Sequence, residues 1–598
     1  NGLFNYFEPG SVLEPGSVLE PEEYGASLSE SDFSRYDRED DYGNVISLNP
    51  KQRDAFQKIA NFGPLSLLQG PPGTGKTEFI AAFVHYLVEK QGVKNILLVS
   101  QSHEAVNTAA ERIRRHCMRL DTPLDVVRFS NREGAVSDGL KDVYSNSIVT
   151  AKRELFRAEI KHRIKSMSQP IGLDKKYLSA LIEMELGIFS NIETLISIKQ
   201  QMSDDSRNES EIDELNRHVK SLEDAIIQSL LDFGYEDIDA INDIFSLKSR
   251  LLKKLEDEYA VRPNESVLAK ALVKISHDMI DVLGTERVNY DEFLARSRQL
   301  VTGTCVGIGQ RHIGISTNQY DWVIIDEAAR SIASELAIAM QSGKRVLLVG
   351  DHKQLPPLYS EPHKKSLARK LGLATKGRDI DDLVASDFAR AFNSSYGKRA
   401  SAQLLTQYRM APPIGDLVSG CFYDGELENG KRAIPDVYKT LPACISKYVN
   451  WIDTSQVGNR ANHKSDRGSS IYNRYEADVV ISLLKDLSSD AMFVASMAGL
   501  VKDGEAAIGV ICMYAEQKRI IRTKFKEHAW SDDFKRLVKI DTVDSYQGKE
   551  NRIIVLSVTR SCEDRSPGFL WSPNRINVAL SRAMDRLVVV GDLNMWRG

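Results

Sequence analysis

The chain has 598 residues, of which 42% are apolar and 27% charged, and its formal net charge is −5. These proportions are ordinary for a globular protein, and the length predicts several domains. The slightly acidic balance excludes a surface that is basic all over, although a local basic groove for nucleic acid is compatible with it. No apolar run approaches the roughly 18 residues of a membrane helix, so we expect no membrane partner.

The six cysteines are scattered along the chain and include no C-x-x-C pair. Neither a zinc site nor a disulfide framework is therefore indicated, and a reducing compartment fits best. Since no signal segment is visible either, we predict an intracellular protein, cytoplasmic or else nuclear. Because the chain begins with Asn1 rather than Met, we expect it to be part of a longer protein.

Residues 1–45 are expected to form a disordered tail or linker. They contain the same hexapeptide twice, at 10–15 and 16–21, and then an acidic run at 39–41. Repetitive, charged sequence of this kind offers little apolar surface to bury. We assign no chemistry to this segment.

The first domain is predicted at residues 46–130 and 297–358. An apolar run at 65–68 leads into Gly-Pro-Pro-Gly-Thr-Gly-Lys-Thr at 70–77 and then into a helix-forming stretch at 78–88. The further strands expected in this domain are 95–100, 124–128, 299–304, 322–325 and 345–349. Strands that alternate with helices in this way predict a parallel, doubly wound nucleotide-binding sheet.

Residues 70–77 have the form of a phosphate loop, G-x-x-x-x-G-K-[ST]. The residues expected to hold the phosphates are Gly70, Gly73, Thr74, Gly75, Lys76 and Thr77. The glycines let the backbone turn its N–H groups and a helix N-terminus toward negative charge. Lys76 would reach the β- and γ-phosphates, and the Thr77 hydroxyl would bind Mg²⁺. A glycine-rich turn with a solvent-facing lysine is the alternative, but such a turn does not need a strand before it and a helix after it.

The strand and helix pattern stops between residues 131 and 296, which we predict to be a helical insertion into the first domain. One stretch carries apolar residues at a spacing of three and four: Ile212, Leu215, Val219, Leu222, Ile226 and Leu230. This stripe is typical of a coiled coil or of a helical hairpin. Two interpretations stay open, an antiparallel insertion that packs on itself and an arm that binds a partner protein or guides a nucleic-acid strand.

Polar side chains follow two strands of the first domain. Asp326 and Glu327 come directly after the apolar run at 322–325, and Gln354 follows the next strand. The carboxyl ends of parallel strands share one edge of a sheet, where ligands bind. Asp326 is the expected direct or water-mediated Mg²⁺ ligand, and Glu327 can orient and deprotonate the attacking water. Gln354 can hydrogen-bond both the γ-phosphate and that water.

A second parallel-sheet domain is predicted at residues 359–598. Its expected strands are 403–405, 508–511, 538–540, 553–557 and 586–590. Arg409 follows the first of these strands, and Arg582 lies on a helix that leads into the last. An arginine inserted beside the γ-phosphate stabilises the charge that develops during phosphoryl transfer. Taken singly, either arginine could equally be a surface ion-pair partner.

These segments, in order, resemble the motifs of superfamily 1 helicases, most closely the branch of the nonsense-mediated-decay RNA helicase, senataxin and their bacterial relatives. The resembling segments are Leu-Asn-Pro-Lys-Gln52, 70–77, 102–106, 304–307, 326–329, 350–357, 407–410, 542–550 and 578–583. The likeness covers about residues 48–598 except the insertion. It implies an α/β fold of two tandem RecA-like domains, a P-loop NTPase, with the long helical insertion in the first.

The resemblance also implies roles for residues that spacing alone does not explain. Gln52 would read the adenine, Tyr408 would stack on the base, and Glu550 would contact the nucleotide from the second domain. Ser102, Ala105, Thr304 and Thr542 would line a groove for single-stranded nucleic acid. ATP and Mg²⁺ would bind between the domains, and hydrolysis would drive movement 5′ to 3′ along the strand.

Three points of the sequence depart from the family pattern. His103 stands where relatives usually carry Asn, the insertion is longer than the matching subdomain of the RNA-decay enzyme, and no room precedes Gln52 for the small β-barrel of some relatives. The choice between DNA and RNA stays open, because the expected contacts involve backbone and stacked bases. An ATP-gated nucleic-acid clamp, or the motor module of a longer effector such as a nuclease, are the alternatives to a helicase.

Overall fold

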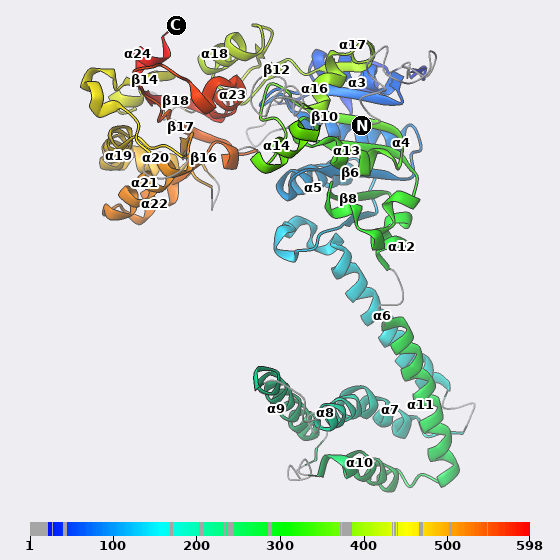
Figure 1. The fold of residues 1–598 in the computed structure, drawn as a ribbon. Coiled ribbons are helices and arrows are strands. Elements are labelled where there is room, and N and C mark those ends of the chain that lie inside the picture. The colour runs from blue at the N-terminus through cyan, green and yellow to red at the C-terminus, as the bar shows by residue number, and fades with distance from the viewer. Residues whose placement is uncertain are drawn as a thin grey trace. The chain divides into compact units, whose positions relative to one another are not determined.

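A computed structural model describes most of the chain. The described residues are 22–26, 28–39, 45–167, 172–201, 209–232, 234–235, 243–284, 290–370, 372, 386–432, 435, 438, 441–465, 470–501, 505–546 and 548–597. The chain forms two compact units, one made of residues 1–145 and 291–598 and the other of residues 146–290. Figure 1 labels many of the helices and strands of both units.

The first sheet of the larger unit has seven strands in the order β11-β5-β10-β9-β6-β8-β7. Their bounds are β5 (Leu65–Gln69), β6 (Ile96–Ser100), β7 (Val126–Arg128), β8 (Leu300–Thr304), β9 (Tyr320–Asp326), β10 (Gly343–Gly350) and β11 (Ser401–Gln403). Every neighbouring pair is parallel, so the carboxyl ends meet at one edge of the sheet. The predicted doubly wound sheet is confirmed.

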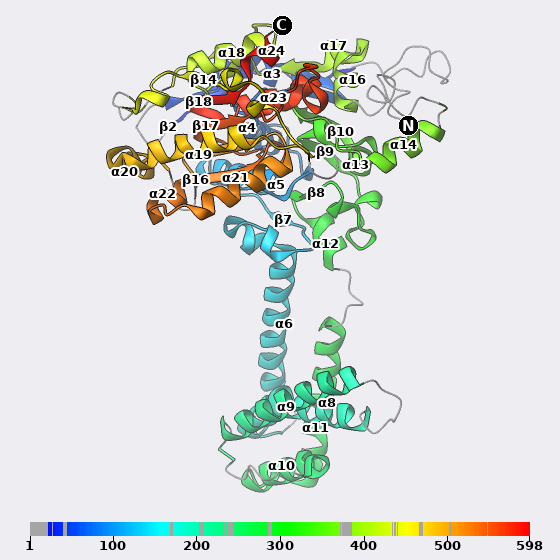
Figure 2. The same ribbon diagram turned by 60° about the vertical axis from the view of Figure 1, so that its left-hand side comes forward.

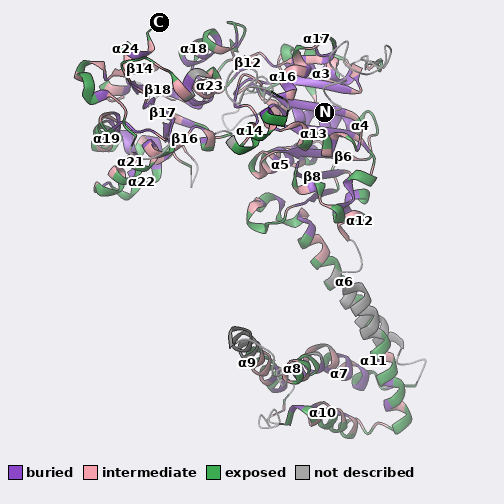
Figure 3. Ribbon diagram, in the orientation of Figure 1, coloured by how far each residue is buried: buried purple, intermediate pink, exposed green. Residues whose placement is uncertain are grey.

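Buried strands and amphipathic helices hold this first domain together. All residues of β5, β6 and β8 are buried, as expected for a parallel sheet covered on both faces (Figure 3). The main helices are α3 (Pro50–Asn61), α4 (Lys76–Glu89), α5 (His103–Arg119) and α13 (Ala333–Met340). Phe56 of α3 and Phe83 of α4 meet at 5.1 Å between ring centroids, and Phe83 contacts Trp322 of β9 at 5.2 Å. These rings anchor the phosphate-loop helix to the sheet.

The boundary that we predicted at residue 359 is wrong. After α14 (Glu361–Lys370), the chain forms α16 (Asp387–Asn393), α17 (Ser395–Ala400) and β11, and β11 pairs with β5 in the first sheet. The Tyr396 hydroxyl also donates to the Leu65 carbonyl at 2.7 Å. Residues 386–404 therefore belong to the first domain. A three-residue edge strand has too short a hydrophobic pattern to reveal which sheet it joins.

The second sheet has five parallel strands in the order β14-β18-β17-β15-β16. Their bounds are β14 (Val449–Asp453), β15 (Ile508–Cys512), β16 (Val538–Thr542), β17 (Asn551–Ser557) and β18 (Ala583–Gly591). β14 was not predicted, because its residues are only half-buried at the sheet edge and show no apolar run. Two short parallel strands, β12 (Thr406–Gln407) and β13 (Glu428–Asn429), lie outside both sheets.

Helices cover both faces of the second sheet (Figure 2). One core contains residues of α19 (Arg474–Ser489), α20 (Ala491–Gly499), α21 (Ala515–Glu527) and α22 (Asp532–Leu537), packed on Val510 and Val588. The other contains residues of α18 (Pro412–Phe422) and α23 (Pro573–Leu580), packed on Ile511 and Val589. Alternate residues of β15 and β18 thus enter different cores, which confirms a second doubly wound domain. α24 (Leu593–Trp596) is the last helix in the described part of this domain.

The expectation of a disordered tail at residues 1–45 is wrong for the described residues 28–39. Here α2 (Glu30–Ser34) presents Phe33 to Phe56 at 5.6 Å, and Tyr36 contacts the rings of His85 and His116 at 5.7 and 5.4 Å. The neighbouring short strands are β1 (Glu22–Glu23), β2 (Arg38–Glu39), β3 (Val45–Ile46) and β4 (Phe62–Gly63). Two aromatic anchors that bind distant helices leave no local periodicity to detect. Both copies of the hexapeptide, at 10–15 and 16–21, lie outside the described residues.

The smaller unit consists of helices over its described residues. They are most of α6 (Ser145–Met167), α7 (Lys175–Met184), the π-helical turn η3 (Glu185–Phe189), α8 (Ser190–Gln201), α9 (Glu209–Asp232), α10 (Ile244–Glu258) and α11 (Pro263–Gly284). Ile226 and Leu230 of the apolar stripe are buried in this unit's own core, and Val219 and Leu222 pack against it. The stripe therefore serves packing within the unit. The side chains of Ile212 and Leu215 lie outside the description.

The limits predicted for the insertion, 131–296, are too wide at both ends. Residues 131–145 stay with the larger unit, where Val136, Leu140 and Tyr144 pack on Ala110 of α5. At the other limit, α12 (Tyr290–Ser297) begins at the last residue of the smaller unit, and its remaining residues belong to the larger unit. The Tyr320 hydroxyl of β9 donates a hydrogen bond to the Ala295 carbonyl of α12. In the described part of the chain, no helix combines the length and apolarity needed to cross a bilayer.

Candidate nucleotide and nucleic-acid site

The phosphate loop joins β5 to α4 at the carboxyl edge of the first sheet. Gly73 and Gly75 have φ angles of 73° and 79°, in the left-handed region that favours glycine. A Cβ atom at Gly73 would lie 2.4 Å from the Cβ of Arg409, and one at Gly70 would lie 2.3 Å from the Cγ of Lys76. Glycine is therefore required at all three positions, by conformation or by close approach.

Side chains of the first domain brace this loop. The Lys76 ammonium donates to the Gly70 carbonyl at 2.6 Å, and the buried Thr74 hydroxyl donates to the Pro71 carbonyl at 2.8 Å. Gln52 donates from Nε2 to the Thr74 carbonyl at 3.0 Å, while its Oε1 accepts from the Asn49 N–H at 2.9 Å. Gln52 thus supports the loop and caps α3. Adenine reading by Gln52 stays a prediction.

The acidic pair lies where β9 ends. Asp326 is the last residue of β9 and is buried, and its Oδ1 accepts from the Glu327 N–H at 2.9 Å. Glu327 has a φ of 55°, an unusual backbone conformation for a residue other than glycine. Burial, together with the charge of Glu327, raises the pKa of Asp326 to about 7, while Lys76 opposes this shift. A cation held at this carboxylate would offset the cost of its burial, so Asp326 fits the predicted Mg²⁺. Thr77 lines the same pocket, and its role as a second ligand stays a prediction.

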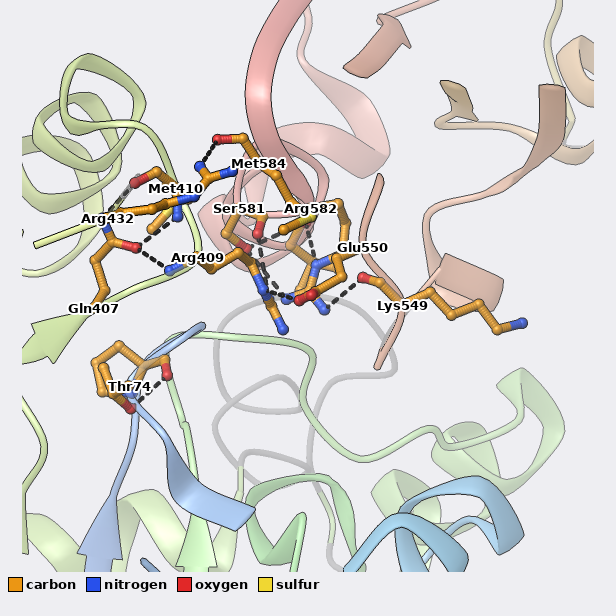
Figure 4. Close-up of polar contacts among 12 residues, drawn as sticks. Thr74, Gln407, Arg409, Met410, Arg432, Lys549, Glu550, Ser581, Arg582 and Met584 are labelled. Carbon is orange, nitrogen blue, oxygen red and sulfur yellow. Dashed lines mark hydrogen bonds and ion pairs between the residues drawn. The ribbon is translucent and has the colours of Figure 1, made fainter. Parts of the chain in front are cut away.

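Arginines of the second domain approach from the other side, as Figure 4 shows. Arg409 forms an ion pair with Glu550 and donates from Nη1 to the Ser581 carbonyl at 3.4 Å. The charge of Arg409, more than any other cause, holds the pKa of Glu550 below its usual value. Arg582 is buried and donates from Nη2 to Gln354 Oε1 at 3.2 Å, which joins the second domain to the first. Burial, reinforced by Arg409, lowers the pKa of Arg582 to about 9, so it stays charged at neutral pH.

One pocket of about 570 Å³ collects most of these side chains. Among the predicted nucleotide residues it is lined by Gly73, Thr74, Gly75, Lys76, Thr77, Asp326, Glu327, Gln354, Tyr408, Arg409, Glu550 and Arg582. Its volume lies in the range of small-molecule sites and its lining is rich in charge, as a nucleotide requires. Gln52 and Gly70 form hydrogen bonds with residues of the phosphate loop but do not line the pocket. Tyr408 is 39% exposed, and its hydroxyl accepts from Asn49 Nδ2 at 2.9 Å.

The predicted nucleic-acid residues lie at the carboxyl edges of the two sheets, but the structure does not bring all of them together. Ser102 caps α5 by accepting from the Ala105 N–H at 3.2 Å, and both residues line the nucleotide pocket. Thr304 ends β8 and accepts from the Gly307 N–H at 3.0 Å. Thr542 ends β16 in the second domain, where its hydroxyl contacts the Ser545 hydroxyl at 3.1 Å. Neither threonine lines the pocket.

Five charged residues of the pocket were not predicted: Arg38, Glu78, Glu104, Arg112 and Arg330. Glu78, in the first turn of α4, pairs with Arg38 at 3.2 Å and with Arg112 at 3.4 Å, and all three line the pocket. Glu78 was readable as part of the phosphate-loop helix. Arg38 gave no signal, because it comes from the segment that we expected to be disordered.

The unusual His103 packs against a buried arginine. Its Nδ1 lies 3.1 Å from Arg128 Nη2, and Arg128 is fully buried at the end of β7. Burial lowers the pKa of His103, and the charge of Arg128 lowers it further. The neutral imidazole can therefore accept a hydrogen bond from Arg128 at neutral pH, as an asparagine oxygen could.

Fold and site define the class first: a P-loop nucleotide-binding protein whose site is shared by two doubly wound domains. Two families described as AAA domain match the chain, one over residues 47–361 and the other over residues 383–594. The chain therefore belongs to the AAA-domain proteins. Among them it belongs to the superfamily 1 helicases, in the branch that contains the regulators of nonsense transcripts and Sen1.

Three similar proteins illustrate the branch. The Regulator of nonsense transcripts 1 homolog of Neurospora crassa is 28% identical over 91% of this chain and 37% of its own length. The ATP-dependent helicase upf1 of Schizosaccharomyces pombe is 26% identical over 92% of this chain and 45% of its own length. Helicase sen1 of the same yeast is 23% identical over 91% and 29%. The chain thus spans less than half the length of these relatives.

Proposed function

We propose that the protein is an ATP-dependent translocase and helicase on single-stranded nucleic acid, moving 5′ to 3′. One observation carries the proposal: Arg409, Glu550 and Arg582 of the second domain line the same pocket as the phosphate loop and Glu327 of the first. A nucleotide in this pocket would touch both domains. Its hydrolysis would therefore change the contact between them, which is the step that a translocase needs.

Each pocket residue has a role in hydrolysis under this proposal. Glu327 accepts the proton of the attacking water, and Gln354 orients that water. Thr77 and Asp326 would hold Mg²⁺, which offsets negative charge on the β- and γ-phosphates. Lys76 contacts the same oxygens once it leaves the Gly70 carbonyl.

The two arginines stabilise the charge that spreads over the γ-phosphate oxygens. Their present acceptors support this role. Glu550 holds Arg409, and Gln354 holds Arg582, inside the pocket rather than in solvent. The phosphate oxygens would replace these acceptors when the domains close on ATP.

Ser102 supports a link between the two ligands. It lies in the nucleotide pocket and at the carboxyl edge of the first sheet, where Thr304 also lies and where the strand groove is proposed. A strand bound across Ser102, Thr304 and Thr542 would contact both domains and favour their closure. Nucleic acid should therefore stimulate hydrolysis.

The experiment is a steady-state ATPase assay with and without single-stranded oligonucleotides. We expect stimulation by the strand, loss of activity in Lys76→Ala and Glu327→Gln, and retained ATP binding in Glu327→Gln. Turnover that ignores nucleic acid would contradict the proposal. Matched DNA and RNA oligonucleotides in the same assay identify the polymer.

A fluorescent duplex with a 5′ overhang then separates a helicase from an ATP-gated clamp. Strand release that requires ATP hydrolysis supports the helicase. Tight binding in the presence of ATP without release supports the clamp. A duplex with a 3′ overhang is the control for direction.

The place of action and the partners belong to the proposal, because the chain spans only part of the length of its relatives. We place its action inside the cell, in the cytoplasm or nucleus, where ATP and single strands occur together. We also propose the helical unit of residues 146–290 as the surface for a protein partner, because it has a core of its own and adds no described residue to the nucleotide pocket. Deleting that unit should leave ATP binding intact and remove the partner.

A further inference from the structure

A buried carboxylate outside the predicted site joins the two domains beside the nucleotide pocket. Asp351 directly follows β10, three residues before Gln354. Its Oδ2 accepts from Gln354 Nε2 at 2.8 Å and from the Tyr423 hydroxyl at 2.6 Å. Its Oδ1 accepts from the Lys353 N–H at 3.1 Å. The same carboxylate oxygen therefore holds Gln354 of the first domain and Tyr423 of the second.

Tyr423 also contacts the element that carries Arg582. Its hydroxyl accepts from Asn577 Nδ2 at 2.9 Å, and Asn577 lies on α23, five residues before Arg582. Asn577 Nδ2 donates in addition to the Lys353 carbonyl at 2.8 Å. In the sequence, Tyr423 directly follows α18, the helix that begins three residues after Arg409. One hydroxyl thus connects the segments that carry both arginines to the loop that carries Gln354.

These contacts close a ring. Starting from Asp351, it passes through Tyr423, Asn577 and α23 to Arg582, whose Nη2 donates to Gln354, and Gln354 donates back to Asp351. Asp351, Gln354, Tyr423, Asn577 and Arg582 are each at most 7% exposed. Water can therefore not replace a lost partner easily, and a buried polar atom left without one destabilises the arrangement that it belonged to.

We propose that Tyr423 is a positioning residue for ATP hydrolysis. Its hydroxyl fixes the position of Gln354 through Asp351 and the position of Arg582 through Asn577, so that both side chains reach the γ-phosphate together. The inference rests on the ATP site of the proposed function and goes beyond it, because Tyr423 belongs to no motif of the sequence analysis and does not line the pocket. A residue of this kind affects the chemical step rather than the binding of ATP.

The test compares two tyrosine to phenylalanine variants of the whole chain. Tyr423→Phe removes the hydroxyl that contacts Asp351 and Asn577. Tyr438→Phe is the matched control, because the Tyr438 hydroxyl also donates at 2.6 Å to a buried carboxylate of the second domain, Asp585 Oδ2, and Tyr438 does not line the pocket. Both variants lose the same atom from the same kind of pair.

Steady-state ATPase kinetics with saturating oligonucleotide give kcat and KM separately. We expect Tyr423→Phe to lower kcat about tenfold with KM changed by less than about twofold, and Tyr438→Phe to leave both within about twofold. Thermal unfolding and the affinity for a fluorescent ATP analogue check that both variants are folded. A fall in Tm shared by both variants, without a difference in kcat, would overturn the inference.

A double-mutant cycle tests the connection to α23. Asn577→Ala should lower kcat in the wild type and have little further effect in Tyr423→Phe, because both remove the same link. Additive losses would contradict a shared link. If the wild type itself hydrolyses no ATP, the proposed function fails instead, so the two failures are distinguishable.

Discussion

The two walls of the nucleotide pocket are built in different ways. Lys76 and Thr77 of the first wall begin the helix of one continuous strand, loop and helix, and Asp326 and Glu327 lie where β9 ends, two strands away in the same sheet. Arg409, Glu550 and Arg582 of the second wall come from three separate segments. Arg409 pairs with Glu550 and donates to the Ser581 carbonyl, and Arg582 donates to Gln354. The first wall is therefore set by local geometry and the sheet, whereas the second is set by polar contacts between side chains.

This difference teaches where control of hydrolysis can reside. A wall fixed by glycines and a buried sheet keeps its shape whether or not the domains close. A wall held by ion pairs and hydrogen bonds can exchange partners at a small net cost, because each contact is replaced by another of the same kind. We expect the second wall to report domain closure and the first to bind ATP in either state.

The largest expected effect concerns an arginine of the second wall. Arg582→Ala should lower kcat by roughly 10³- to 10⁵-fold, the contribution of a positioned arginine to phosphoryl transfer. ATP affinity should change far less, because the phosphate loop is untouched. The control is Arg519→Ala, at an exposed arginine of α21. A loss of affinity as large as the loss of kcat would show that the two walls do not divide the work in this way.

Glu327→Gln is the matching change in the first wall. It keeps the size of the side chain and removes the base, so kcat should fall by roughly 10²- to 10⁴-fold with ATP still bound. Single-turnover hydrolysis measures the chemical step directly. Because ATP then persists, this variant should also keep the domains closed on a single strand and bind it more tightly. Weaker binding of the strand than in the wild type would count against coupling through closure.

A change behind the first wall should affect stability rather than catalysis. Phe33→Ala removes a buried ring that contacts Phe56, and it should lower the free energy of unfolding by about 3 kcal/mol. The comparison variant is Phe293→Ala, because Phe293 is 64% exposed. Denaturant unfolding measures both. An equal, small effect of the two changes would contradict the anchoring of residues 28–39 on the first domain.

A pH dependence of stability distinguishes the two domains. Burial raises the pKa of Glu476, on α19, from 4.5 to about 8. The folded state thus binds a proton that the unfolded state releases, and this contribution to stability is present below pH 4.5 and is lost as the pH rises through 8. The slope is at most about 1.4 kcal/mol per pH unit. Glu476→Gln should flatten the decline in urea midpoints between pH 5 and 8.

The first domain should respond in the opposite sense. Burial lowers the pKa of His116 from 6.5 to about 4. The unfolded state then binds more protons than the folded state between these values, so stability rises with pH up to 6.5. His116→Gln should reduce that rise while leaving the decline above pH 6.5 in place. An unchanged profile would show that the pKa of His116 is the same in the folded and unfolded states.

Much of the fold was predictable because it depends on short-range signals. Buried parallel strands such as β5 and β9 are continuous apolar runs, and the phosphate loop has its own residue pattern. Signals failed where an element owes its place to distant partners. The edge strands β11 and β14 lack a full apolar run, and Phe33 and Tyr36 anchor α2 to helices that follow later in the chain.

The candidate site divides along the same line. The residues of the first wall could be named from the motif that contains each of them. In the second wall, the positions of Arg409 and Arg582 near strands made them candidates, with a surface ion pair as the alternative for each. Glu550 was named only through the resemblance, since nothing local marks it. Arg38 and Tyr423 were not predicted at all, because neither a periodicity nor a motif marks them.

The sequence by itself determined that there are two nucleotide-type sheets and one phosphate loop, because apolar runs, glycines and strand-end carboxylates act over a few residues. Only the tertiary structure decided which distant side chains share the pocket, where the first domain ends, and that Tyr423 meets Asp351 and Asn577. These facts depend on contacts between distant residues: Tyr423 and Asp351 are 72 positions apart, Arg582 and Gln354 are 228 apart, and Tyr396 and Leu65 are 331 apart. No local pattern specifies such contacts, because the free energy that selects them comes from burying both partners together.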